Sequence, residues 1–172
     1  MGLFSNLFGK KEEATKIEPI PGDFSDEAII APVTGTFLPT KDISDPVFAD
    51  ETLGQTVAIV PSKGTVYAPV NGTIDMLADT AHAFSMTTAD ETQVLVHIGI
   101  DTVGLNGKGF KILAQKGSTV KAGTPVISAD LDVIKKAGLD TAVMMILVDV
   151  PEGKTITFKE FTDVEAGTVI NQ

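Results

Sequence analysis

The segment DTAHAFSMTTADETQVLVHIGIDT, residues 79–102, decides how this chain folds. It holds two runs of apolar and β-branched residues on either side of a polar break, Ala-Asp-Glu-Thr, at residues 89–92. This pattern predicts a β-hairpin whose loop is centred on Asp90 and Glu91. The segment also contains both histidines of the chain. The pairing of its two strands therefore decides whether the histidines meet.

A loop with an even number of residues places His97 opposite Phe84 and His82 opposite Gly99. The two histidines are then diagonal neighbours on one face of the sheet, with α-carbons roughly 7 to 8 Å apart. Thr80 shares that face if the strand extends back to it, and its hydroxyl is then placed to orient one ring nitrogen. Gly99 leaves room for both rings. A register shifted by one residue would place the rings on opposite faces, so the prediction depends on the loop length.

The whole chain is predicted to be all-β, with the architecture of an antiparallel β-sandwich or flattened barrel and a few short helices. Short apolar runs alternate with clusters of Gly, Pro, Asn and Asp, which is typical of antiparallel β proteins. Helix is expected to be scarce, and the best candidates are residues 131–137, which Gly138 ends, and a turn near residues 109–114. The predicted strands cover residues 28–31, 56–60, 65–68, 73–77, 83–88, 93–100, 124–129, 142–148 and 155–158.

An internal repeat supports this architecture. APVTGTF at residues 31–37 (the first repeat) returns as APVNGTI at residues 68–74 (the second repeat). Each repeat is typical of a strand, a proline-bearing turn and a second strand, which suggests pseudo-symmetry. The repeats are similar to segments of biotinyl and lipoyl carrier domains, as is VKAGTPVI at residues 120–127. Neither repeat leads into the hairpin-tip lysine that those carriers need.

The chain is long enough for one domain, since it has 172 residues and a mass of 18.0 kDa. We expect residues 1–26 to form a flexible N-terminal tail and residues 27–172 to form the domain. Residues 1–9 are amphipathic, and two lysines follow them. This pattern fits a frayed tail, and it also fits a tail in weak contact with a membrane surface. No secretory signal is recognisable, and a cytoplasmic location is predicted.

The composition excludes several classes of function. Lys and Arg number 13 against 23 Asp and Glu, and the net charge of −10 argues against nucleic acid as a partner. The chain has no cysteine, which excludes disulfides, thiolate metal sites and a cysteine nucleophile. Covalent chemistry would therefore fall to His82 and His97.

Three interpretations of the two histidines remain open on these grounds. A neutral imidazole nitrogen can attack a phosphoryl group while the other ring binds its oxygens. Two imidazoles can also supply part of a zinc site, although two ligands leave a tetrahedral site incomplete. One or both residues can instead be ordinary polar residues on a strand.

At these residues the sequence resembles the glucose-type enzyme IIA family of the bacterial phosphoenolpyruvate:sugar phosphotransferase system. The resemblance runs through APVTGTF, DPVFADETLG, VYAPVNGTI, TAHAFSM and VLVHIGIDTVGLNGKGF. It covers residue 29 to the end of the chain and weakens after residue 129. Two histidine motifs at a fixed spacing make this signature specific.

The resemblance implies a role for each site residue. His97 would accept a phosphoryl group from the carrier protein HPr and pass it to a sugar-specific IIB domain. His82 would support the transfer by contacting the phosphoryl oxygens, and Thr80 would position the His82 ring. The remaining residues would bind the partner proteins, through carboxylates that meet arginines and through an apolar patch: Asp45, Val47, Phe48, Gly99, Asp101 and Val103.

The resemblance implies no required cofactor, and it leaves the sugar open. An alternative is a regulatory interaction module that uses the same face to bind permeases or kinases and shares zinc with them through His82 and His97. The sequence departs from the family at Ala78 and Leu95, where an aromatic residue is common. These departures predict a less aromatic docking surface.

Overall fold

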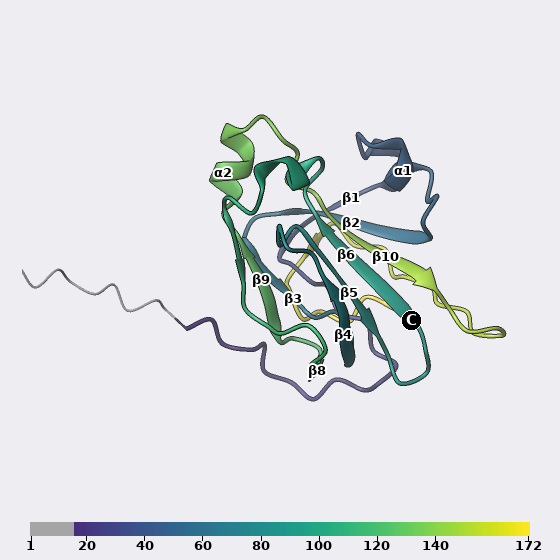
Figure 1. Cartoon of the computed structure of the whole chain (residues 1–172). Coiled ribbons are helices and arrows are strands. Elements are labelled where there is room, and N and C mark those ends of the chain that lie inside the picture. Colours follow the sequence, from purple (N-terminus) through teal and green to yellow (C-terminus); the bar gives the residue numbers. More distant parts are fainter. Residues whose placement is uncertain (1–15) are drawn as a thin grey trace, which may run out of the picture.

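The computed structural model describes residues 16–172 (Figure 1). Its helices are short: η1 (Thr40–Asp42), α1 (Pro46–Ala49), η2 (Thr102–Leu105) and α2 (Leu131–Lys136). The predicted all-β class is confirmed, because most elements are strands and all their pairings are antiparallel. The strands are β1 (Gly35–Leu38), β2 (Gln55–Pro61), β3 (Thr65–Tyr67), β4 (Gly72–Leu77), β5 (Ala83–Thr87), β6 (Gln93–Ile98), β7 (Phe110–Ile112), β8 (Thr119–Val120), β9 (Pro125–Ala129), β10 (Val143–Asp149) and β11 (Asp163–Val164).

Two sheets enclose the main core. The larger sheet has the order β11-β1-β2-β10-β6-β5-β4-β8, and the smaller one has the order β3-β9-β7. Phe84, Val96 and Ile98 of the larger sheet are buried in one cluster with Val126 and Ile127 of β9. Figure 1 shows β3 and β9 lying beside β4, β5 and β6, with α1 and α2 at the same end of the sheets.

A second apolar cluster lies on the other face of the larger sheet. Met144 and Ile146 of β10 are buried there against Ile43 and Phe48, which η1 and α1 bring to the sheet. Residues of β6 alternate between the two faces, because successive side chains of a strand point in opposite directions. Since Val96 and Ile98 face the main core, His97 faces the side of the second cluster.

The two repeats bind each other through equivalent hydrogen bonds. Ile30 N, just before the first repeat, donates to Pro69 O of the second repeat at 2.9 Å. Tyr67 N, just before the second repeat, donates to Pro32 O of the first at 2.8 Å. This reciprocal pairing agrees with the pseudo-symmetry that the sequence suggests.

The predicted register of the central hairpin is wrong by one residue. His97 pairs with Ala83, not with Phe84, and Ile98 N donates to His82 O, so Gly99 does not face His82. Thr88 N donates to Thr92 O, so the loop between them consists of residues 89–91, an odd number. The last residue of this loop, Glu91, takes a left-handed conformation with φ of 69°. A left-handed residue after a turn is typical of three-residue hairpin loops.

Several other elements also differ from the expectation. The segments at 28–31 and 155–158 form isolated bridges instead of strands. The turn expected near 109–114 contains strand β7, whereas the helix expected at 131–137 is present as α2.

The N-terminal part of the described chain contacts the domain. Ile20 N donates to Gly123 O at 2.9 Å, and the Asn71 side chain donates to Phe24 O and to Asp26 Oδ1, each at 2.9 Å. Residues before position 27 therefore also pack against the domain. The division into a tail of residues 1–26 and a domain of residues 27–172 stays a prediction. The amphipathic stretch 1–9 lies outside the described residues. Within residues 16–172, no helix is both long and apolar enough to cross a membrane.

Candidate active site

His97 lies near the end of β6 on the outer face of the larger sheet. Its neighbour across the sheet is Met144 of β10 on one side and Ala83 of β5 on the other. The Nδ1 atom lies 2.8 Å from Gly99 O. Because a carbonyl oxygen only accepts, Nδ1 carries the proton, and the neutral ring has its lone pair on Nε2. The backbone therefore selects one tautomer of His97.

His82 reaches the same site by a different route from the one predicted. It precedes β5, so the alternation of that strand does not fix its direction. The residue before it, Ala81, has a left-handed backbone with φ of 56°, and Ala81 N donates to Ala78 O at 2.8 Å. This turn directs the His82 ring toward His97, and the two ring centroids lie 5.1 Å apart. The structure thus brings the histidines together despite the shifted register.

Thr80 holds the second imidazole. Its Oγ1 lies 2.6 Å from His82 Nδ1. The hydroxyl can donate to Nδ1, and His82 then carries its proton on Nε2. In that arrangement one ring offers a lone pair and the other an N–H group.

Both imidazoles are biased toward the neutral form. Burial lowers the pKa of His82 below its ordinary value of 6.5. Burial also lowers the pKa of His97, as does the neighbouring His82, while the hydrogen bond to Gly99 and the carboxylates of Asp45 and Asp101 partly oppose this. A neutral imidazole is the nucleophilic form.

Phe48 lies beneath the site and offers little surface to a partner. Its side chain is only 6% exposed, and its ring centroid is 5.0 Å from that of His97. It packs in the second apolar cluster, where it supports the His97 ring. The family resemblance implied that Phe48 belongs to the docking patch, whereas this geometry gives Phe48 a packing role.

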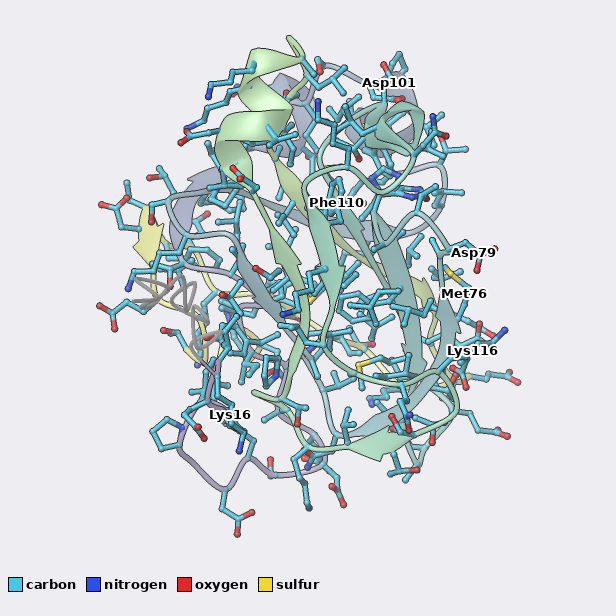
Figure 2. All side chains as sticks on the ribbon, turned by 60° about the vertical axis from the view of Figure 1, so that its left-hand side comes forward. Lys16, Met76, Asp79, Asp101, Phe110 and Lys116 are labelled. Atoms are coloured by element: carbon cyan, nitrogen blue, oxygen red, sulfur yellow. The ribbon has the colours of Figure 1, made fainter. Side chains whose placement is uncertain are left out.

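The other predicted partner-binding residues form a rim. Val47 and Val103 are exposed by 44% and 53%, although both are apolar. Asp45 caps α1 by accepting from Val47 N at 2.8 Å, and Asp101 precedes η2. Both carboxylates act on the pKa of His97, so they lie within electrostatic reach of it. Figure 2 shows Asp101 at one end of the molecule.

Gly99 has a structural role in this rim, since it is buried and has φ of 71°. An added Cβ would lie 2.4 Å from Thr102 Cγ2 and 2.7 Å from Asp140 O. Only glycine fits this position without strain. The residue is therefore needed for the turn that presents its carbonyl to His97.

A metal at this site would find two imidazole ligands. Within residues 16–172, no group of three or more His, Cys, Asp or Glu side chains is placed to hold a metal ion. Zinc binding would thus require ligands from a partner, and it stays a prediction.

Sequence reasoning missed the residues that fix the backbone around His97. Thr102 is fully buried, and its Oγ1 donates to Ile98 O at 2.5 Å. The only sequence signal for it was its place in the motif GIDT, which also contains Gly99 and Asp101.

Comparisons with known proteins show which family this chain is similar to. The family model of the phosphoenolpyruvate-dependent sugar phosphotransferase system, EIIA 1, matches residues 27–152. A PTS system glucose-specific EIIA component of Buchnera aphidicola is 35% identical over 170 residues, covering 99% of this chain and 97% of the relative. The component of the same name from Staphylococcus epidermidis is 34% identical over 165 residues, covering 96% of this chain and 94% of the relative.

The fold also matches a solved structure, the glucose permease IIA from Mycoplasma capricolum. The match has a TM-score of 0.77 and 32% sequence identity, and it covers 84% of this chain and 93% of the other. The matches span most of the chain, and the range 27–152 matched by the family model contains both histidines of this chain. The chain therefore belongs to the EIIA 1 family of the phosphoenolpyruvate-dependent sugar phosphotransferase system, and it is a phosphoryl-transfer component of sugar uptake.

Proposed function

We propose that Nε2 of His97 takes a phosphoryl group from phosphorylated HPr and passes it to a sugar-specific IIB domain. The observation that carries the proposal is the hydrogen bond from His97 Nδ1 to Gly99 O at 2.8 Å. It leaves the Nε2 lone pair free as the nucleophile while the ring stays neutral.

In the first step, His97 Nε2 attacks phosphorus, and the bond between phosphorus and its donor atom on HPr breaks. His82 lies 5.1 Å away between ring centroids, close enough for its Nε2–H to donate to a phosphoryl oxygen. Such a donor stabilises the charge that the oxygens carry during transfer. In the second step a nucleophile of the IIB domain attacks phosphorus, and the bond between phosphorus and His97 Nε2 breaks.

The rim suits transient protein partners. Val47 and Val103 offer apolar contact area, and Asp45 and Asp101 offer carboxylates for basic side chains. The net charge of −10 adds long-range attraction toward a basic carrier surface. A cytoplasmic location is part of the same proposal, because HPr would have to reach His97 there.

The relatives are named as glucose-specific components, so we expect a IIB domain of a glucose permease to be the best acceptor. A panel of purified IIB domains, each mixed with the phosphorylated protein, tests this choice. If the protein transfers its phosphoryl group fastest to a IIB domain for another sugar, that result would contradict the expected preference for the glucose permease. The regulatory alternative with shared zinc stays a prediction.

A further inference from the structure

We propose that Thr102 is a positioning residue that fixes the tautomer of His97 through the backbone of Gly99. The inference deepens the proposed function, because it names the group that keeps the Gly99 carbonyl in place. It concerns a side chain that does not touch the phosphoryl group.

Two peptide units flank Gly99, and each is held at both ends. In the first, Ile98 O accepts from Thr102 Oγ1 at 2.5 Å, and Gly99 N donates to Ala142 O at 2.8 Å. In the second, Gly99 O accepts from His97 Nδ1 at 2.8 Å, and Ile100 N donates to Asp140 O at 3.0 Å. The direction of the Gly99 carbonyl therefore depends on both units.

Glycine cannot hold this geometry alone, because it adopts many backbone conformations with little difference in energy. Thr102 restrains it in two ways. Its hydroxyl binds the peptide before Gly99, and its Cγ2 occupies the space where a Cβ of Gly99 would lie, 2.4 Å away. Loss of the hydroxyl leaves the first peptide unit held at one end only, by the bond from Gly99 N to Ala142 O, so we expect the unit to tilt and the Gly99 carbonyl to move away from His97 Nδ1.

The test compares Thr102→Val, which removes the hydroxyl and keeps the shape, with Thr102→Ser, which keeps the hydroxyl and removes the methyl group. The ¹⁵N chemical shifts of His97 report which ring nitrogen carries the proton. We expect the wild-type protein and Thr102→Ser to show the Nδ1–H form, and Thr102→Val to show a mixture of both tautomers. The rate of phosphoryl acceptance from HPr should fall about tenfold in Thr102→Val, the lower end of the loss when an orienting partner of a histidine is removed.

Wild-type ¹⁵N shifts in Thr102→Val would overturn the proposal. Equal disturbance in Thr102→Ser would also overturn it, because the methyl group would then be the cause. The ¹⁵N readout needs no partner protein. A failure of the proposed function, seen as an unlabelled wild-type protein, is therefore distinguishable from a failure of this inference.

A separate observation points to a modification site in the loop after η2. We infer that Asn106 deamidates spontaneously, whereas Asn71 does not, although glycine follows both. Asn106 is exposed, and its side-chain amide makes only a long contact of 3.4 Å to Gly104 O. Within residues 16–172, the N–H of Gly107 donates no backbone hydrogen bond.

The chemistry needs only water. Hydroxide removes the proton from Gly107 N, which attacks Asn106 Cγ; the Cγ–Nδ2 bond breaks, and Nδ2 takes a proton from water and leaves as ammonia. Water then opens the cyclic imide to aspartate or isoaspartate. Glycine favours this attack because it has no side chain to hinder the approach.

Asn71 provides an internal control. It is buried, its Nδ2 donates to Phe24 O and Asp26 Oδ1, and its Oδ1 accepts from Ala122 N at 2.8 Å. The following Gly72 begins β4 and cannot move freely. In the folded protein the Asn71 side chain is thus held away from the backbone nitrogen that would attack it.

The loop of Asn106 also lies close to the active site. A Cβ added to Gly107 would be 3.9 Å from both Cα and O of Thr80, the residue that binds His82. Isoaspartate lengthens the backbone here, so it should disturb the Thr80 turn. Figure 2 shows Asp79, the neighbour of Thr80, on the same side of the molecule as Asp101.

Peptide mapping by mass spectrometry after incubation of the full chain at mildly alkaline pH tests this inference. We expect deamidation of the Asn106 peptide alone in the folded protein, and of both peptides in denaturant. Gly107→Ala should slow the reaction at Asn106. An unmodified Asn106 peptide in the folded protein would overturn the inference, as would modification of Asn71 at the same rate.

Discussion

The imidazoles of His82 and His97 meet edge to face, with ring centroids 5.1 Å apart and ring planes inclined by 77°. Each ring has its Nδ1 held by another group, Thr80 Oγ1 for His82 and Gly99 O for His97. This leaves the Nε2 atoms of both rings for chemistry. Two protonated rings at this distance would repel each other, so the pair favours at least one neutral ring.

His82→Gln should separate the two steps of transfer. His97 keeps its Nδ1 bond to Gly99 O, so the variant should still accept the phosphoryl group. Onward transfer to a IIB domain should fall by about 100-fold, because one donor to the phosphoryl oxygens is lost or displaced. Rapid-quench measurement of both half-reactions checks this, and an unchanged rate of onward transfer would contradict the supporting role of His82.

Thr80 should act through the tautomer of His82. Thr80→Val removes the hydroxyl that lies 2.6 Å from His82 Nδ1, and we expect onward transfer to slow by about tenfold. Thr80→Ser, the matched control, keeps the hydroxyl and should retain most of the rate. If Thr80→Val and Thr80→Ser transfer the phosphoryl group to the IIB domain at equal rates, the hydrogen bond from Thr80 to His82 has no role in transfer.

The rate of phosphoryl acceptance should stay constant from alkaline pH down to below 6.5. Burial lowers the pKa of both histidines, so His97 stays neutral and nucleophilic in this range. The rate should then fall as pH drops through the lowered pKa of His97. An NMR titration of the imidazoles gives the same midpoint independently, and a midpoint at or above 6.5 would disagree with the buried geometry.

The same shifts predict how the free energy of unfolding depends on pH. Below about 6.5 the unfolded chain binds protons on its histidines that the folded chain does not. The free energy of unfolding should therefore be highest above this pH and decrease as pH falls toward the lowered pKa values of the folded protein. His97→Gln should flatten this part of the curve, measured by urea unfolding at a series of pH values.

Gly99→Ala should destabilise the protein, whereas Gly104→Ala should not. Gly99 has φ of 71°, and an added Cβ would lie 2.4 Å from Thr102 Cγ2. We expect a loss of about 1 to 3 kcal/mol in the free energy of unfolding, the usual cost of overpacking. Gly104 is exposed in η2 with no atom within 4 Å of an added Cβ, so Gly104→Ala should gain about 0.4 to 1 kcal/mol. Equal stability of the two variants would argue against the tight turn at Gly99.

The sequence predicted the fold class well, because its strand signals are local. Alternating apolar residues and Gly and Pro punctuation mark most strands of both sheets. Short elements escaped prediction, such as β8 and β11, which have two residues each. Their pairing depends on distant partners that no local pattern reveals.

The meeting of the two histidines was predicted through a wrong register. Two left-handed residues changed the geometry, Glu91 in the hairpin loop and Ala81 before His82, with φ of 69° and 56°. Neither is Gly, Asn or Asp, the residues that usually mark this conformation. The first shifts the register by one residue, and the second redirects His82 to the face of His97.

The exposure of Phe48 could not be predicted from its position in the chain either. It lies one residue after the exposed Val47 in a four-residue helix, too short to show a clear apolar period. Only the packing of α1 against Met144 and His97 decides that Phe48 points inward.

The most direct test of the account is phosphorylation of the purified protein by phosphoenolpyruvate, enzyme I and HPr, followed by peptide mapping. We predict one acid-labile, base-stable phosphoryl group on Nε2 of His97, and no labelling of His97→Ala. His82→Gln serves as the control that retains the acceptor. Labelling of His97→Ala at the wild-type level, or a phosphoryl group mapped to His82 instead, would contradict the assignment of His97 as the acceptor.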